Sequence, residues 1–156
     1  MEVFIEEVEP ATYDPDDPYD IPYDYWIVAK LNNGQRINIL VDAYDLTELK
    51  GKKAKFYIYA KEALEYPEKK VFTTSGNYHS KYKISIDEIE KFFMYDLIPE
   101  KTTKEEYFKD FLEGRPALTT ENGTYFASEN PSYNDGDLID YNVLQFYPSF
   151  WYPIDD

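Results

Sequence analysis

Carboxylates are the side chains with the most capacity for chemistry in this sequence. A proline-rich segment, residues 9–24, carries five aspartates close together: Asp14, Asp16, Asp17, Asp20 and Asp24. Oxygen ligands at this density suit calcium, but the segment lacks the turn glycine and the terminal glutamate of an EF-hand loop. Its prolines also stiffen a chain that would have to curl around an ion. We therefore expect a solvated acidic arm without a cofactor, and calcium is the metal to test.

A second acidic turn holds Asp135 and Asp137. Its composition resembles that of a calcium loop, but when the loop is counted from Asn130, Asp135 stands at the position that requires glycine. The Asp135-Gly136 pair is typical of a tight turn instead. The sequence therefore predicts a turn here and leaves any metal ligand unknown.

Candidate catalytic groups are few. The sequence has no cysteine and a single histidine, His79, which stands in a polar stretch. This removes thiolate nucleophiles and most of the material for zinc sites and serine–histidine–aspartate triads. Paired carboxylates could serve glycoside hydrolysis, but among 31 acidic residues close pairs arise by chance. We predict no catalytic residue and keep one alternative, a hydrolase or a domain that binds a small ligand or cation with clustered carboxylates and tyrosines in a cleft.

The distribution of charge points to a partner. The net charge is −15, yet residues 1–29 and 116–156 contain no Lys or Arg, and all 16 bases lie between Lys30 and Arg115. If the two ends meet in space, as domain termini often do, they form a surface of one sign. Such a surface repels phosphate backbones and attracts basic proteins. We expect a basic protein partner and no direct contact with nucleic acid.

Aromatic side chains accompany the acids at both ends of the chain. Tyr and Trp carry much of the binding energy at protein interfaces because they bury a large area and still form hydrogen bonds. The candidate partner-binding residues are Asp14, Asp16, Asp17, Tyr19, Asp20, Tyr23, Asp135, Asp137, Trp151 and Tyr152. The simpler interpretation is that the rings pack both termini onto the core and the acids keep the chain soluble.

These features favour a non-enzymatic interaction module that binds a basic protein, as an inhibitor, an immunity protein or a mimic of nucleic-acid charge. Pairing of the aromatic termini with a second copy of the chain, as a homo-oligomer, is left open. No stretch reaches the roughly 18 apolar residues of a spanning helix, and the N-terminus is acidic where a signal peptide is basic. We therefore expect a cytoplasmic protein without membrane contact.

The chain length of 156 residues suits one domain. We expect an irregular acidic arm at 9–24, strands over 25–84, two helices over 85–114, strands over 117–147, and an aromatic and acidic tail at 148–156. Residues 25–31 and 35–41 flank Asn33-Gly34, a strong hairpin signal. Apolar residues then alternate along 53–60, which predicts a third strand with one buried face.

Capping boxes predict the helices. Ser85 with Glu88, and Thr103 with Glu106, have the spacing of such boxes. Asn122-Gly123 predicts a further hairpin in the last third. The fold class is α+β and strand-dominated: an antiparallel meander or small curled barrel with an OB-like outline, two short helices and a Pro-rich acidic N-terminal arm.

Overall fold

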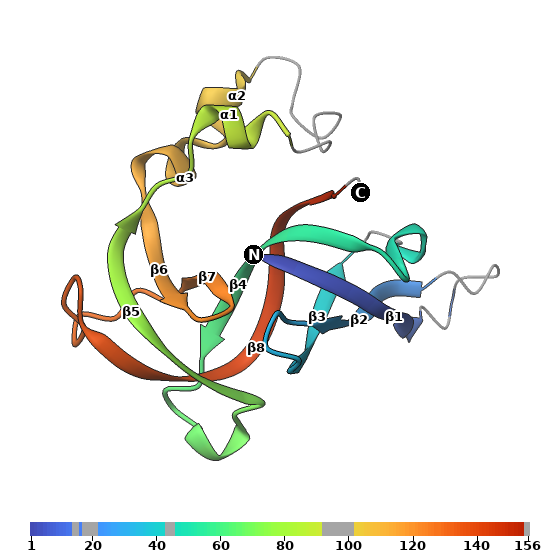
Figure 1. The fold of residues 1–156 in the computed structure, drawn as a ribbon, viewed down its shortest axis with the longest axis horizontal. Coiled ribbons are helices and arrows are strands. Elements are labelled where there is room, and N and C mark those ends of the chain that lie inside the picture. The colour runs from blue at the N-terminus through green and yellow to red at the C-terminus, as the bar shows by residue number, and fades with distance from the viewer. Residues whose placement is uncertain (14–15, 17–21, 43–45, 92–101, 155–156) are drawn as a thin grey trace.

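Strands make up most of the described chain and join in one mixed sheet (Figure 1). The computed structural model describes residues 1–13, 16, 22–42, 46–91 and 102–154. The strands are β1 (Glu2–Tyr13), β2 (Pro22–Lys30), β3 (Arg36–Asp42), β4 (Lys53–Glu62), β5 (Phe72–Tyr82), β6 (Arg115–Thr120), β7 (Gly123–Ala127) and β8 (Leu138–Pro153).

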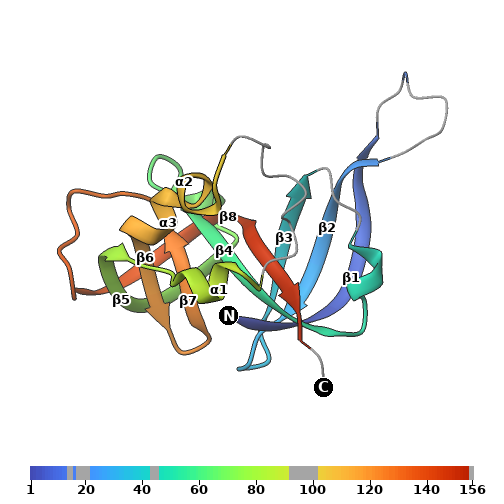
Figure 2. The same ribbon diagram turned by 90° about the horizontal axis from the view of Figure 1, so that it is seen from above.

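The helices are short and lie together on one side of the sheet (Figure 2). They are α1 (Ile86–Ile89), α2 (Lys104–Tyr107) and α3 (Lys109–Glu113), with 3₁₀ turns at Thr47–Leu49 and Pro67–Lys69. Ser85 accepts a hydrogen bond from the Glu88 N–H, and Thr103 accepts one from the Glu106 N–H, each at 3.2 Å. The predicted N-caps are therefore confirmed. None of the helices in the described residues has the length and apolar character needed to cross a membrane.

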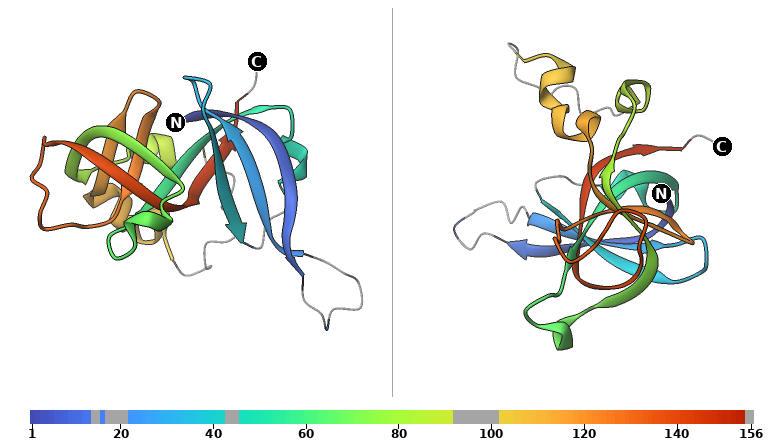
Figure 3. Two further views of the ribbon diagram at one scale, coloured as in Figure 1. Left: turned by 90° about the horizontal axis from the view of Figure 1, so that it is seen from below. Right: turned by 90° about the vertical axis from the view of Figure 1, so that its left-hand side faces the viewer.

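The sheet closes on itself. Its strand order is β1-β2-β3-β8-β4-β7-β6-β5, with additional pairings between β1 and β4 and between β8 and β5. The first extra pairing closes a ring of β1, β2, β3, β8 and β4, and the second closes a ring of β8, β4, β7, β6 and β5. Figure 3 shows β1–β3 on one side and β5–β7 on the other, with β4 and β8 running between them.

The strand-dominated fold is confirmed, but an antiparallel meander is wrong. β3 pairs with β8, and β4 with β7, in parallel. The first of these pairs arises because β8, which comes from the end of the chain, inserts between β3 and β4. Turn chemistry predicts pairs of strands joined by short loops, and it carries no information on strands that meet from distant parts of the sequence.

Strand structure also enters the predicted arm and tail. β1 continues to Tyr13 and β2 begins at Pro22, so both ends of the 9–24 segment pair with each other. Register shifts on either side of Thr12 accommodate this stretch, as bulges do for proline. The predicted tail at 148–156 is the end of β8 as far as Pro153, and it pairs along β4.

Two neighbouring residues of β8, Phe150 and Trp151, belong to two different apolar clusters. Trp151 is buried in the main core, where it stacks on Phe56 at 6.0 Å between ring centroids. Phe150 points to the other side and meets Phe108, which joins α2 to α3, at 4.9 Å. Burying a large apolar side chain contributes about 1.5–3 kcal/mol. The helices are therefore held against the sheet by aromatic packing.

Candidate functional site

The structure describes only part of the predicted partner-binding set. Outside the described residues lie Asp14, Asp17, Tyr19 and Asp20. Asp16 is described and exposed, and Tyr23 is described only as a backbone position in β2. The role of these residues stays a prediction.

Asp135 and Asp137 organise a turn. Asp135 accepts hydrogen bonds from the Ser80 backbone N–H at 2.9 Å and from the Ser80 hydroxyl at 3.3 Å. The backbone hydrogen bond from Ser80 is the main cause that lowers the pKa of Asp135. Asp137 accepts from the Asn134 N–H at 2.9 Å. This turn, between β7 and β8, and the far end of β1 lie at opposite ends of the molecule (Figure 1).

Trp151 and Tyr152 are occupied within the fold. Trp151 is only 2% exposed. Tyr152 donates a hydrogen bond of 2.7 Å to Glu88 Oε1. The described members of the predicted set therefore do not form one surface.

The two ends of the described chain meet on either side of β4. Ala54 pairs with Val3 of β1 on one side and with Pro153 of β8 on the other. Lys53 and Lys55 flank Ala54, and neither is buried. The junction of the termini is therefore of mixed charge, and a surface of one sign has to be sought elsewhere.

On the outward side of β1, β2 and β3, the residues that pair across the strands form rows that differ in charge from one end to the other. Ile27 and Ile39 are fully buried, so their neighbours in the strands point outward. From the loop end to the opposite end, the rows in register are Thr12–Asp24–Asp42, Glu9–Trp26–Leu40, Glu7–Val28–Asn38 and Phe4–Lys30–Arg36. We call this surface, formed by Glu7, Glu9, Asp24, Trp26, Val28, Asn38 and Leu40, the β1–β3 face. It combines a partly exposed apolar centre with acids toward one end.

Charge changes sign along the β1–β3 face. At the loop end, Asp24 of β2 pairs in backbone register with Asp42 of β3. Oδ1 of Asp24 is buried and accepts no hydrogen bond within the described part of the chain. A buried acceptor without a donor costs about 1–3 kcal/mol. At the other end, Arg36 Nε lies 2.7 Å from Glu6 Oε2, so the guanidinium already has an anionic partner.

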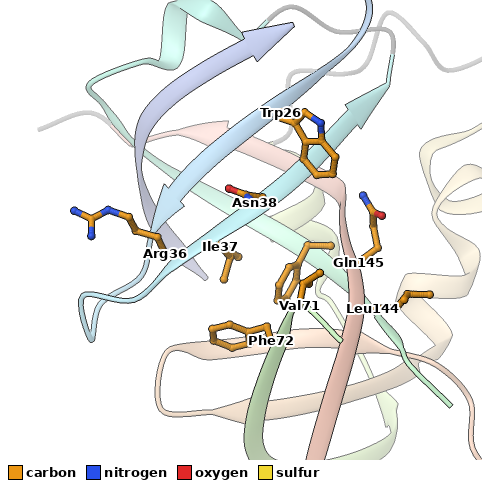
Figure 4. Close-up of a pocket in the computed structure, with 9 residues that line it drawn as sticks. Trp26, Arg36, Ile37, Asn38, Val71, Phe72, Leu144 and Gln145 are labelled. Carbon is orange, nitrogen blue, oxygen red and sulfur yellow. The ribbon is translucent and has the colours of Figure 1, made fainter. Parts of the chain in front are cut away.

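A shallow pocket opens beside this face, where β3 and β8 separate (Figure 4). The two strands pair only at Ile39 and Phe146. The pocket measures about 130 Å³, and its walls include Trp26 from β2, Asn38 from β3, and Leu144 from β8. We call it the Trp26 pocket. This volume is below the roughly 300–1,000 Å³ of a site for a drug-sized ligand, so it suits one side chain of a larger partner.

A buried carboxylate lies at the end of β4. Glu62 is 8% exposed, and among the described residues no Lys or Arg forms an ion pair with it. Tyr133 donates to Glu62 Oε2 at 2.6 Å, and Asn130 donates to Oε1 at 3.1 Å. Burial, and then the hydrogen bond to Glu62, raise the pKa of Tyr133. The loop after β7 therefore supplies both side-chain donors to this carboxylate.

Glu62 also lines a larger hollow of about 450 Å³. The residues around it are Lys61, Glu62, Ala63, Leu64, Glu65, Tyr66, Ser128 and Leu144. We call it the Glu62 hollow. Leu144 lines both this hollow and the Trp26 pocket, so the two adjoin. Leu64 is 58% exposed and Val71 is 66% exposed, which adds apolar surface along the connection between β4 and β5.

Other candidates from the sequence find simpler roles. His79 Nε2 lies 2.9 Å from Thr119 Oγ1, and within the described ranges no carboxylate hydrogen-bonds to the ring. A general base needs such an orienting partner and a pocket. In the same residues no group of three or more histidine or acidic side chains is placed to hold a metal ion. The aspartates of the arm that could test calcium binding are mostly outside the described residues.

The position of Glu62 in the sequence indicates a buried acid, but this is easily overlooked among 31 acidic residues. Along β4 the buried positions are Ala54, Phe56, Ile58 and Ala60, and the next position in this alternation is Glu62. An acid at an inward position of a strand is costly unless it is hydrogen-bonded, so such a position marks a polar network. The partner Tyr133 follows far along the chain, and no local pattern links the two.

No protein family, curated protein or solved structure matches this chain. The assignment of a function therefore depends on the geometry described above.

Proposed function

We propose that this chain is a non-enzymatic interaction module that binds a basic segment of a partner protein on the β1–β3 face. The observation that carries the proposal is the row Glu9–Trp26–Leu40 next to Asp24. A partly exposed Trp beside apolar neighbours is a typical anchor of an interface. Acids around it select a cationic partner.

An OB-like arrangement of the first ring supports the choice of face. The ring order β1-β2-β3-β8-β4, with β3 parallel to β8, fits a five-stranded Greek-key barrel of the OB type. In such folds the surface of the second and third strands binds extended ligands. Here that surface carries acids, and a phosphate backbone would meet repulsion. An extended basic polypeptide is the ligand that fits both shape and charge.

The biological roles that suit such a module are those of an inhibitor, an immunity protein or a mimic of nucleic-acid charge. A cytoplasmic location stays a prediction, as does self-association through the aromatic termini. Hydrolysis is not proposed, because the hydrogen-bond partners of the Glu62 carboxylate are Tyr133 and Asn130, not a second carboxyl group.

A short peptide that alternates lysine and leucine tests the proposal. Calorimetric titration should show binding at about 0.01 M salt and a marked loss at about 1 M, where charges are screened within about 3 Å. Replacing Glu7, Glu9 and Asp24 together by their amides should weaken binding about tenfold at low salt, since each exposed pair contributes up to about 1 kcal/mol.

The matched control removes three acids far from the face. Glu105→Gln, Glu106→Gln and Glu113→Gln make the same change in net charge on α2 and α3. This triple variant should keep most of the affinity. If both triple variants lost the same affinity for the peptide, net charge alone would explain the binding and the proposal would be wrong. Peptide binding that does not change with salt would also overturn the proposal.

A further inference from the structure

The Glu62 carboxylate lacks a positive counterpart. It is more than nine-tenths buried, and in the described chain its partners are two neutral donors, Tyr133 and Asn130. A carboxylate offers about four acceptor positions on its two oxygens, so two hydrogen bonds leave acceptor capacity unused. Taking a carboxylate out of water costs several kcal/mol unless charge or hydrogen bonds compensate. A cation brought by a ligand would supply the missing compensation.

The surroundings of Glu62 suit a cation on an apolar stem. The Glu62 hollow is about 450 Å³, within the range of specific ligand sites. Ala63, Leu64 and Leu144 give it apolar walls, whereas Glu62 and Glu65 give it negative charge. Lysine and arginine side chains match these walls, because their methylene stems pack on apolar surface and their charged head groups pair with an anion.

Two lysines of the chain itself lie near the hollow. Lys61 lines the hollow but is exposed, on the outward side of β4, and it forms no ion pair with Glu62. Lys69 lies over the ring of Tyr66, with its Nζ atom 4.7 Å from the ring centroid. The cation–π contact shows that Tyr66 already interacts with a cation, so we assign no ligand contact to this ring.

We infer that the Glu62 hollow binds the ammonium group of a lysine side chain, or the guanidinium group of an arginine, presented by a partner. The head group lies at the Glu62 carboxylate, and the stem lies along Leu64 and Leu144. Identification of the partner as a basic protein rests on the proposed function. Leu144 connects the hollow to the Trp26 pocket, so one extended basic segment on the β1–β3 face reaches both sites.

Blocked amino acids test this site without a partner protein. The probes are Nα-acetyl-lysine methylamide, the arginine analogue, and Nα-acetyl-norleucine methylamide, which keeps the aliphatic stem and lacks the charge. In ¹H–¹⁵N spectra of the full chain, the lysine and arginine probes should shift the Asn130 side-chain amide and the Ala63 and Ser128 backbone amides. The norleucine probe should shift them at least about tenfold less at equal concentration, because it cannot form the charge-assisted hydrogen bond to the Glu62 carboxylate.

Glu62→Gln keeps the size of the side chain and an acceptor for Tyr133. Its affinity for the lysine probe should fall about thirtyfold or more, as when one member of a buried ion pair is lost. Glu65→Gln, in the same hollow but exposed, should change affinity less than about threefold. Equal responses to lysine and norleucine in the wild-type chain would overturn the inference, even if Glu62→Gln did not fold.

The two proposals fail separately. Unchanged peptide binding in the Glu7, Glu9 and Asp24 variant, with binding of the lysine probe to the wild-type chain, supports the hollow and not the face. The reverse result, with Glu62→Gln binding the lysine probe normally, overturns the inference and leaves the proposed function in place. Shifts that appear only on the β1–β3 face also overturn it.

Discussion

The Tyr152 hydroxyl donates a hydrogen bond of 2.7 Å to Glu88, and so connects the end of β8 to α1. Lys55 of β4 reaches the same carboxylate oxygen at 3.1 Å. Burial acts to raise the pKa of Glu88, but hydrogen bonds from Tyr152, Tyr57 and Lys55 outweigh it and lower the pKa to about 2. Three strand residues therefore stabilise the ionised form of one helix residue.

Acid should weaken this connection in a defined pH window. The ordinary pKa of a glutamate side chain is 4.5, and the pKa of Glu88 in the folded state is about 2, so the folded state binds the proton less tightly. The stabilisation is fully present above pH 4.5 and is lost as the pH falls toward 2. Glu88→Gln should lower stability at neutral pH and flatten its dependence on pH between these values.

Urea unfolding at a series of pH values measures this effect. The control is Glu113→Gln, because Glu113 is exposed and lies 3.8 Å from Lys109 in a surface pair of little energetic consequence. If Glu88→Gln and wild type lose stability in parallel below pH 4.5, Glu88 is not the group responsible.

Removal of the Tyr133 hydroxyl should destabilise the fold through Glu62. Tyr133→Phe leaves the buried Glu62 Oε2 without its donor, and the loss of such a donor costs about 1–3 kcal/mol. Tyr66→Phe serves as the control, since Tyr66 is 53% exposed. The difference in the free energy of unfolding between the two variants measures the hydrogen bond, and no difference would mean that water replaces it.

Trp26→Ala should weaken binding of the lysine–leucine peptide about tenfold or more, since it removes the aromatic anchor of the β1–β3 face. Leu138→Ala is an apolar truncation elsewhere, at a side chain that is 76% exposed, and it should leave binding unchanged. Calorimetry at low salt compares them. Unchanged affinity in Trp26→Ala would place the peptide on another surface.

Gly76→Ala should destabilise the second ring. A Cβ atom at Gly76 would clash with the backbone oxygen of Thr119 and would lie 3.0 Å from Leu118 Cγ, so β5 and β6 would have to separate. Overpacking of this kind typically costs about 1–3 kcal/mol. Asn77→Ala, at the exposed neighbouring position, should have a much smaller effect on the midpoint of urea unfolding.

Local patterns predicted much of the fold. Asn33-Gly34 joins β2 to β3, and Asn122-Gly123 joins β6 to β7, as hairpin chemistry requires. The alternation along β4 correctly placed Phe56 and Ile58 in the core. These predictions succeeded because each depends on residues only a few positions apart.

The position of β8 in the sheet was not predicted, because β8 pairs with strands that lie far from it in the sequence. Trp151 stands among acids and prolines, a context that is typical of an exposed tail, yet it pairs with Phe56. The β1–β3 face was not predicted either, since Trp26, Glu9 and Leu40 become neighbours only through the register of three strands. The identity of these residues was visible in the sequence, whereas their adjacency was not.

The sharing of β4 and β8 by both rings has a consequence for cooperativity. Neither ring can lose these two strands without opening the other, so β4 and β8 should be the last strands to lose their hydrogen bonds. Amide hydrogens of β4 and β8 should then exchange with solvent only by global unfolding, at a free energy equal to that of the whole molecule. Ligand binding on the first ring should therefore slow amide exchange in β4 and β8, since a ligand that binds only the folded state raises the free energy of global unfolding.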